Sequence, residues 1–68
     1  MSNYYVNKNP QPTGEHEVHI VGCPTPPLPA NRLQLGNLTN CSEALREARK
    51  YYSNVDGCKN CVPRCHTR

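Results

Sequence analysis

A chain of 68 residues is long enough for one domain but too short for a large hydrophobic core. The composition makes that core smaller still, because the chain has no Trp, no Phe and only 35% hydrophobic residues. The formal charge of +3 is modest, and no segment approaches the ~20 apolar residues of a membrane span. These features exclude a large enzyme core and a membrane protein. A metal, disulfides or a partner is expected to supplement the core.

The N-terminal half favours short strands. Residues 4–6 have strand composition, and residues 16–21 begin with the polar/apolar alternation of a half-buried strand. We expect these segments to pair as an antiparallel hairpin across residues 7–14, which contain two prolines. Residues 23–31 predict a proline-rich, extended loop. Residues 32–36 alternate again and predict a third short strand.

One helix is predicted after Asn40. Asn40 can cap its N-terminus, and Glu43 completes a capping-box-like pair. The pattern places apolar and charged side chains on different faces. The predicted apolar face contains Cys41, Ala44, Leu45, Ala48, Tyr51 and Tyr52. Residues 1–68 thus predict a single zinc-stabilised α+β domain, with a two- or three-stranded antiparallel sheet, one helix and a Cys-x2-Cys knuckle.

Two short pairs of residues carry the clearest chemistry. Cys58-x2-Cys61 places two thiolates close enough to bind one metal ion, and His19-x3-Cys23 can complete a tetrahedral set. We predict that these four residues bind one structural Zn2+ per chain. Thiolate-rich sites also accept iron, so the sequence leaves the choice between these metals open.

Other Cys and His residues compete for ligand roles. His16 and His19 point to opposite faces of a strict strand, so only one of them is expected to face the metal. Cys65 and His66 could replace a predicted ligand. Alternatively, they could form a terminal turn near the knuckle, with His66 as a hydrogen-bond partner behind a ligand. Cys41 is expected to be a small buried side chain on the helix.

The cysteine count and the N-terminal residues bear on the redox compartment. Five cysteines cannot form a complete set of disulfides within one chain. The first residues show neither the basic nor the apolar region of a secretory leader. We therefore expect a cytoplasmic protein whose cysteines bind metal. A secreted fragment whose leader has been removed is the alternative.

Four motifs follow one another in a distinctive order along the chain. They are His19-x3-Cys23, Asn31-Arg32-Leu33, Ser42-Glu43-Ala44-Leu45 and Gly57-Cys58-Lys59-Asn60-Cys61-Val62-Pro63. Over roughly residues 18–63 this order resembles the Ada-like metal-binding domain, although the segment between helix and knuckle is longer here. The chain also resembles small bacterial proteins that open with Tyr-Tyr-Val-Asn-Lys-Asn and end near Cys-His-Thr.

The resemblance implies a zinc site built from a strand end and a C-x2-C-x-P knuckle. In the alkyl-phosphotriester repair protein of this family, the first ligand is a cysteine that accepts a methyl group from DNA phosphate. In versions attached to some nucleases the first ligand is His, as at His19 here. Imidazole is a poor substitute for a zinc thiolate as an alkyl acceptor. A methyl-acceptor role is therefore not expected.

Catalysis has little support in the sequence. Four protein ligands leave no open position on a zinc ion for water. The acidic side chains show no paired motif; they are Glu15, Glu17, Glu43, Glu47 and Asp56. We expect a non-enzymatic, monomeric module that binds another macromolecule.

Two kinds of partner are weighed. Basic residues concentrate in the last third of the chain and favour nucleic acid; they are Arg46, Arg49, Lys50, Lys59, Arg64 and Arg68. Three thiolates and Zn2+ would add −1 to the charge of +3, leaving about +2. Residues 24–29 contain overlapping P-x-x-P patterns, which favour a protein partner. The same residues could serve only as a stiff connection.

Overall fold

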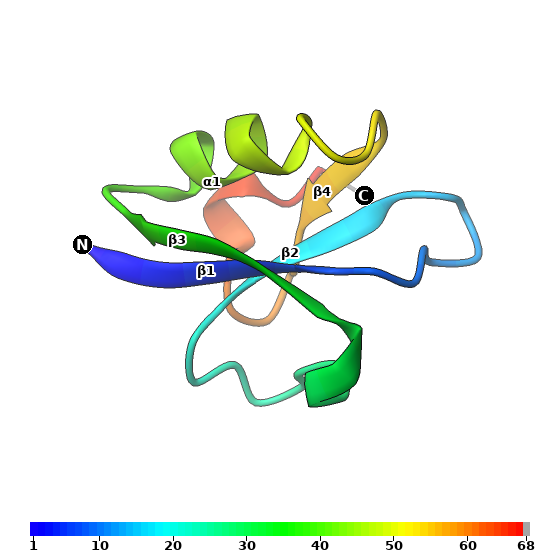
Figure 1. The fold of residues 1–68 in the computed structure, drawn as a ribbon, viewed down its shortest axis with the longest axis horizontal. Helices are drawn as coiled ribbons and strands as arrows, with labels where there is room; N and C mark the ends of the chain where they lie inside the picture. Colours follow the sequence, from blue (N-terminus) through cyan, green and yellow to red (C-terminus); the bar gives the residue numbers. More distant parts are fainter. Residues whose placement is uncertain (68) are drawn as a thin grey trace.

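The computed structural model describes residues 1–67 and contains a four-stranded sheet in the order β3-β1-β2-β4 (Figure 1). The elements are β1 (Ser2–Asn7), β2 (His16–Ile20), η1 (Pro29–Asn31), β3 (Arg32–Leu38), α1 (Cys41–Ala48), β4 (Val55–Gly57) and η2 (Pro63–Cys65). The predicted α+β class is confirmed. The sheet has one strand more than predicted and is mixed, because β4 runs parallel to β2.

The predicted hairpin between the first two strands forms the centre of the sheet. β1 pairs antiparallel with β2, with Tyr5 opposite His19 and Val6 opposite Val18. β3 pairs with the other edge of β1, and the register shifts between Tyr4 and Tyr5. β3 extends to Leu38, two residues beyond the predicted end, because its pairing with β1 continues to the chain's N-terminus.

β4 is the element that sequence patterns did not indicate. Residues 53–57 contain Ser, Asn, Asp and Gly and therefore predict only a turn. In the structure, β4 is three residues long and pairs with β2, with Glu17 opposite Asp56. A parallel pair needs a long crossover connection. Here the chain passes through β3 and α1 before it returns to β2.

The helix begins where its capping residue predicts. The Asn40 side chain accepts a hydrogen bond from the Glu43 backbone N–H at 3.0 Å. The Glu43 carboxylate in turn accepts one from the Thr39 backbone N–H at 2.8 Å. The first bond satisfies an N–H group in the first turn, and the second fixes the residue before the cap, so the pair resembles a capping box shifted by one residue.

The helix ends earlier than its apolar pattern suggests. α1 stops at Ala48, and Tyr51 is 57% exposed, so the prediction that Tyr51 lies on the buried face is wrong. Tyr52 is half-buried and stacks on His16 with ring centroids 3.7 Å apart. No α-helix within residues 1–67 has the length and apolar character needed to cross a membrane.

Alternation along the strands gives the two faces of the sheet different contents. Tyr4 and Val18 pack in the hydrophobic core with Ala44 of α1. The next residues along each strand, Tyr5 and His19, point to the opposite face and stack on each other at 5.5 Å. In Figure 1, α1 lies above the sheet and the loop that follows β2 lies below it. Apolar packing therefore closes one face, while the other face carries the polar site.

Gly57 offers a test of the packing at the end of β4. A Cβ atom there would lie 2.9 Å from the Val62 carbonyl oxygen and 3.0 Å from backbone atoms of Cys65. Backbone cannot yield as a side chain does, so we expect Gly57→Ala to cost about 1–3 kcal/mol of stability. Thermal unfolding monitored by circular dichroism would measure the change, with Ser42→Ala at an exposed position of α1 as the control. An unchanged melting temperature for Gly57→Ala would contradict this packing.

Candidate metal centre

The four predicted ligand residues lie together beside the end of β2. One donor atom from each of His19, Cys23, Cys58 and Cys61 lies within 4.8 Å of the others. The first three side chains are buried and Cys61 is half-buried. The structure thus gathers the full set that the spacing selected from distant parts of the chain, and this set could hold a metal ion.

A tight turn after β2 positions Cys23. The Cys23 backbone N–H donates to the Ile20 carbonyl at 3.1 Å and closes the turn. Gly22 within it has φ 93°, a left-handed conformation that glycine adopts without steric cost. The turn brings Cys23 back beside His19, although strand geometry alone would carry the chain away.

The parallel pairing of β4 positions the knuckle. The Cys58 backbone N–H donates to the Val18 carbonyl at 2.9 Å, which continues the β2–β4 ladder by one residue. The Val62 N–H then donates to the Cys58 carbonyl at 2.7 Å and closes the loop that carries Cys61. The unexpected fourth strand is therefore what carries the Cys-x2-Cys motif to His19.

Two of the distances between donor atoms match those of a tetrahedral site. Cys23 Sγ lies 3.8 Å from Cys58 Sγ, and Cys61 Sγ lies 3.7 Å from His19 Nδ1. Ligands at ~2.3 Å (sulfur) and ~2.0–2.1 Å (nitrogen) from one zinc ion would be separated by about 3.8 Å and 3.6 Å. Three thiolates and an imidazole form a soft donor set that suits zinc. The residues present therefore fit a tetrahedral metal ion.

Hydrogen bonds around the sulfur atoms affect their ionisation. The Ile20 backbone N–H donates to Cys61 Sγ at 3.4 Å, and the Thr25 hydroxyl lies 3.7 Å from Cys23 Sγ. Burial opposes ionisation of Cys23, but hydrogen bonds from Cys61 and Thr25 outweigh it and lower the Cys23 pKa. Burial and the bond to Cys23 raise the pKa of Cys61. A bound cation would remove this conflict by stabilising all the thiolates together.

His19 is oriented as a neutral ligand through Nδ1. Burial, followed by the positive charge of Arg32, lowers the His19 pKa and favours the uncharged imidazole that binds metals. A metal ion bound at Nδ1, which faces Cys61, would leave the proton on Nε2, and Nε2 lies at an ion-pair distance of 3.7 Å from Glu17 Oε1. A carboxylate behind a metal-binding histidine fixes its tautomer and makes it a stronger ligand. Glu17 is thus a supporting residue that the sequence reasoning missed.

The competing histidines lie outside the group of four. His16 stacks on Tyr52, and its Nδ1 lies 2.9 Å from the Asn7 carbonyl oxygen. His66 Nδ1 donates to the Gly57 carbonyl at 2.8 Å and lies 3.3 Å from Asp56 Oδ2. His66 therefore supports the backbone just before Cys58, and among the described residues it forms no hydrogen bond with a side chain of the four ligand residues.

Cys41 and Cys65 form a disulfide bond across 24 residues. The expectation of a simple buried thiol at Cys41 therefore needs correction, although Cys41 is buried as predicted. The cysteine count could have indicated this disulfide, because assigning three of the five cysteines to a metal leaves two that can pair. The bond ties the first turn of α1 to η2, directly after the knuckle. Disulfides are rare in the cytosol, so this one weighs against the cytoplasmic expectation.

Comparison with known proteins found no match for this chain. No protein-family model matches the chain, and neither curated proteins nor solved structures gave a match. The resemblance to the Ada-like domain stays a prediction that rests on the motifs alone. The metal centre is accordingly argued from its geometry.

The support that Glu17 gives to His19 can be measured as metal affinity. We expect Glu17→Gln to weaken Zn2+ binding by about tenfold, since it removes the negative charge facing Nε2 while keeping the side chain's shape. Competition with a chromophoric chelator at neutral pH would give the affinity. Glu47→Gln, a surface carboxylate that pairs with Lys50 on α1, is the matched control and should bind as the native chain does. Equal affinities for both variants would contradict the role of Glu17.

Proposed function

We propose that this chain is a small domain organised by one structural Zn2+ bound to His19, Cys23, Cys58 and Cys61. The observation that carries the proposal is the convergence of four protein donor atoms within 4.8 Å. Four such donors complete a tetrahedral shell, whereas a catalytic zinc keeps a position for water. The metal therefore serves the fold, and the domain has no enzymatic role.

A structural role for the metal favours a binding function over catalysis. A small, non-catalytic zinc domain offers a rigid surface, and this one acts as a monomeric module that binds another macromolecule. Kinship with Ada-like domains is supported by the order of the ligand pairs and the helix between them. His19 stands where the repair protein has its acceptor cysteine, so methyl transfer is not part of the proposal.

Paired cysteine variants test the structural role of the metal. We expect Cys58→Ser to abolish zinc binding and unfold the domain, since metal binding and folding are one equilibrium in such sites. Cys41→Ser should keep one zinc per chain while losing about 3 kcal/mol of stability, because it opens only the disulfide. Elemental analysis of purified protein, with circular dichroism before and after chelation, would measure both effects. A folded, zinc-free Cys58→Ser variant would contradict the proposal.

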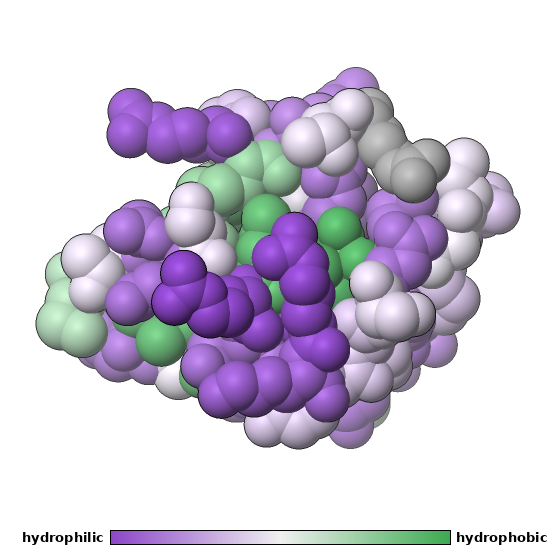
Figure 2. Space-filling view, turned by 90° about the horizontal axis from the view of Figure 1, so that it is seen from above, coloured by the Kyte–Doolittle hydropathy of each residue, from purple (hydrophilic) through white to green (hydrophobic). Residues whose placement is uncertain are grey.

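Nucleic acid is the second candidate partner, and the α1 side of the molecule favours it. Arg46, Arg49 and Lys50 are exposed on or just after α1, and Arg64 is exposed on η2. Figure 2 looks onto this side and shows elongated hydrophilic side chains lying across it, with apolar surface between them. Glu47 neutralises part of this charge through its 2.9 Å ion pair with Lys50. The remaining arginines could contact phosphates.

Salt dependence separates this candidate from an apolar protein interface. If the α1 side binds DNA, anisotropy of a labelled duplex should show an affinity that falls steeply between low and physiological salt. The double variant Arg46→Gln/Arg49→Gln should reduce the slope of log affinity against log salt by about 1.8, or ~0.9 per lost contact. Lys8→Gln, at an exposed position in another part of the chain, is the control. Binding that is absent at low salt would reject nucleic acid as the partner.

A further inference from the structure

The proline-rich loop between β2 and β3 is unusually exposed for so small a domain. Leu28 is 70% exposed and Val21, just before the loop, is 61% exposed. These are two of only four large hydrophobic side chains exposed within residues 1–67. A loop that only connected β2 to β3 would be expected to pack these side chains against the domain, because burying apolar surface stabilises the fold.

The middle of the loop, residues 26–28, favours the polyproline II conformation, whereas Pro24 and Thr25 form a bend and Pro29 begins η1. Four of its residues, Pro24, Pro26, Pro27 and Pro29, have φ fixed by their rings. Leu28 has φ −58° and ψ 145°, which lies in the polyproline II region. This conformation has no internal hydrogen bonds and leaves its carbonyl groups open. Among residues 1–67, no hydrogen bond reaches the carbonyl oxygens of Pro24, Thr25 or Pro26.

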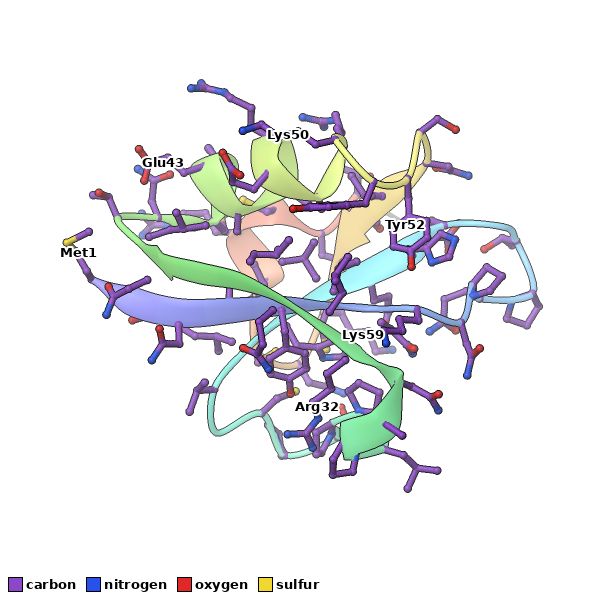
Figure 3. All side chains as sticks on the ribbon, viewed as in Figure 1. Met1, Arg32, Glu43, Lys50, Tyr52 and Lys59 are labelled. Carbon is purple, nitrogen blue, oxygen red and sulfur yellow. A yellow bond between two sulfur atoms is a disulfide. The ribbon has the colours of Figure 1, made fainter. Side chains whose placement is uncertain are left out.

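Two anchors hold the loop in one conformation, and both lie beside the metal centre. Asn60, between the two knuckle cysteines, donates from its side chain to the Thr25 hydroxyl at 2.9 Å. Arg32 Nε donates to the Pro27 carbonyl at 3.0 Å, and its guanidinium lies 4.9 Å from the centre of the Tyr5 ring. Figure 3 shows Arg32 on the side of the sheet away from Glu43 and Lys50 of α1.

The loop stands away from the sheet between these anchors. A hollow of about 200 Å³ lies beneath it, lined by Tyr5, Gly22, Pro26, Arg32 and Gln34 among others. The loop is therefore fixed at Cys23, Thr25 and Pro27, while its outer side faces solvent. A fixed conformation removes ordering cost from a binding partner, which is the advantage of pre-organised proline-rich ligands.

We propose that the exposed segment at residues 26–28, held in shape beside the metal centre, is a short polyproline II ligand for an aromatic-lined groove on a partner protein. This inference rests on the proposed function and names its partner class. Proline rings and Leu28 offer apolar ridges for aromatic side chains, and the open carbonyl oxygens accept hydrogen bonds from Trp or Tyr donors. The loop lies on the opposite side of the sheet from the arginines of α1, so the two candidate surfaces are separate.

Titration with purified polyproline-binding domains tests this inference. The probes are one SH3, one WW and one EVH1 domain, each added to the zinc-loaded, isotope-labelled full chain and followed by amide NMR. We expect at least one probe to shift resonances of residues 21–32 selectively, with a Kd of about 10–500 μM, weak binding by the usual affinity scale. Leu28→Ala should weaken that binding at least fivefold. Tyr51→Ala, which removes another exposed hydrophobic side chain, from the α1 side, should not.

A second variant tests the anchoring of the loop. Asn60→Ala removes the bond to Thr25 without removing a ligand, so zinc stoichiometry should stay at one while binding to the probe weakens severalfold. Fast backbone motion in the zinc-loaded native loop, or no selective shift with any of the three probes, would overturn the inference. Those results leave the proposed function standing if zinc is bound. Loss of the proposed function would show instead as a folded chain that binds no zinc.

Discussion

The approach of four donor atoms, one imidazole and three thiols, is the constraint on which the rest of the structure depends. It joins the end of β2 to a knuckle that is distant in sequence, and α1 cannot do this because it packs on the other face of the sheet. Without a cation, burial and the hydrogen bond to Cys23 oppose ionisation of Cys61. With a bound cation, the closeness of the sulfur atoms stabilises the fold. This face of the sheet has little apolar packing to replace the contribution of the metal.

The five cysteines belong to two cross-links on opposite sides of the sheet. Three belong to the metal cluster, and Cys41 and Cys65 form the disulfide that joins α1 to η2. The disulfide acts chiefly by restricting the unfolded chain, whereas the metal acts on the folded state. Both cross-links include cysteines of the segment after β4, where His66 and Thr67 also form hydrogen bonds to residues of this strand. A short chain with few apolar residues thereby fixes both sides of its sheet.

Much of this arrangement could be predicted from local patterns. Alternation gave the central hairpin, Asn40 and Glu43 gave the start of α1, and ligand spacing selected the four residues that the structure brings together. Features that depend on contacts between distant residues could not be predicted in this way. β4 is only three residues of turn-like composition, and it becomes a strand because β2 offers a free edge. The disulfide and the position of Glu17 behind His19 depend on the tertiary fold, and no spacing rule reports them.

Native mass spectrometry of the purified, unreduced chain, beside the same sample denatured in acid, tests the central claim most directly. The account predicts one zinc ion per folded chain, lost on acidification. It also predicts a denatured mass two hydrogen atoms below that of the reduced chain, as one disulfide requires. A folded, metal-free chain would contradict the account. A mass four hydrogen atoms lower would also contradict it, because two disulfides among five cysteines must include at least two of the three cysteines assigned to the metal.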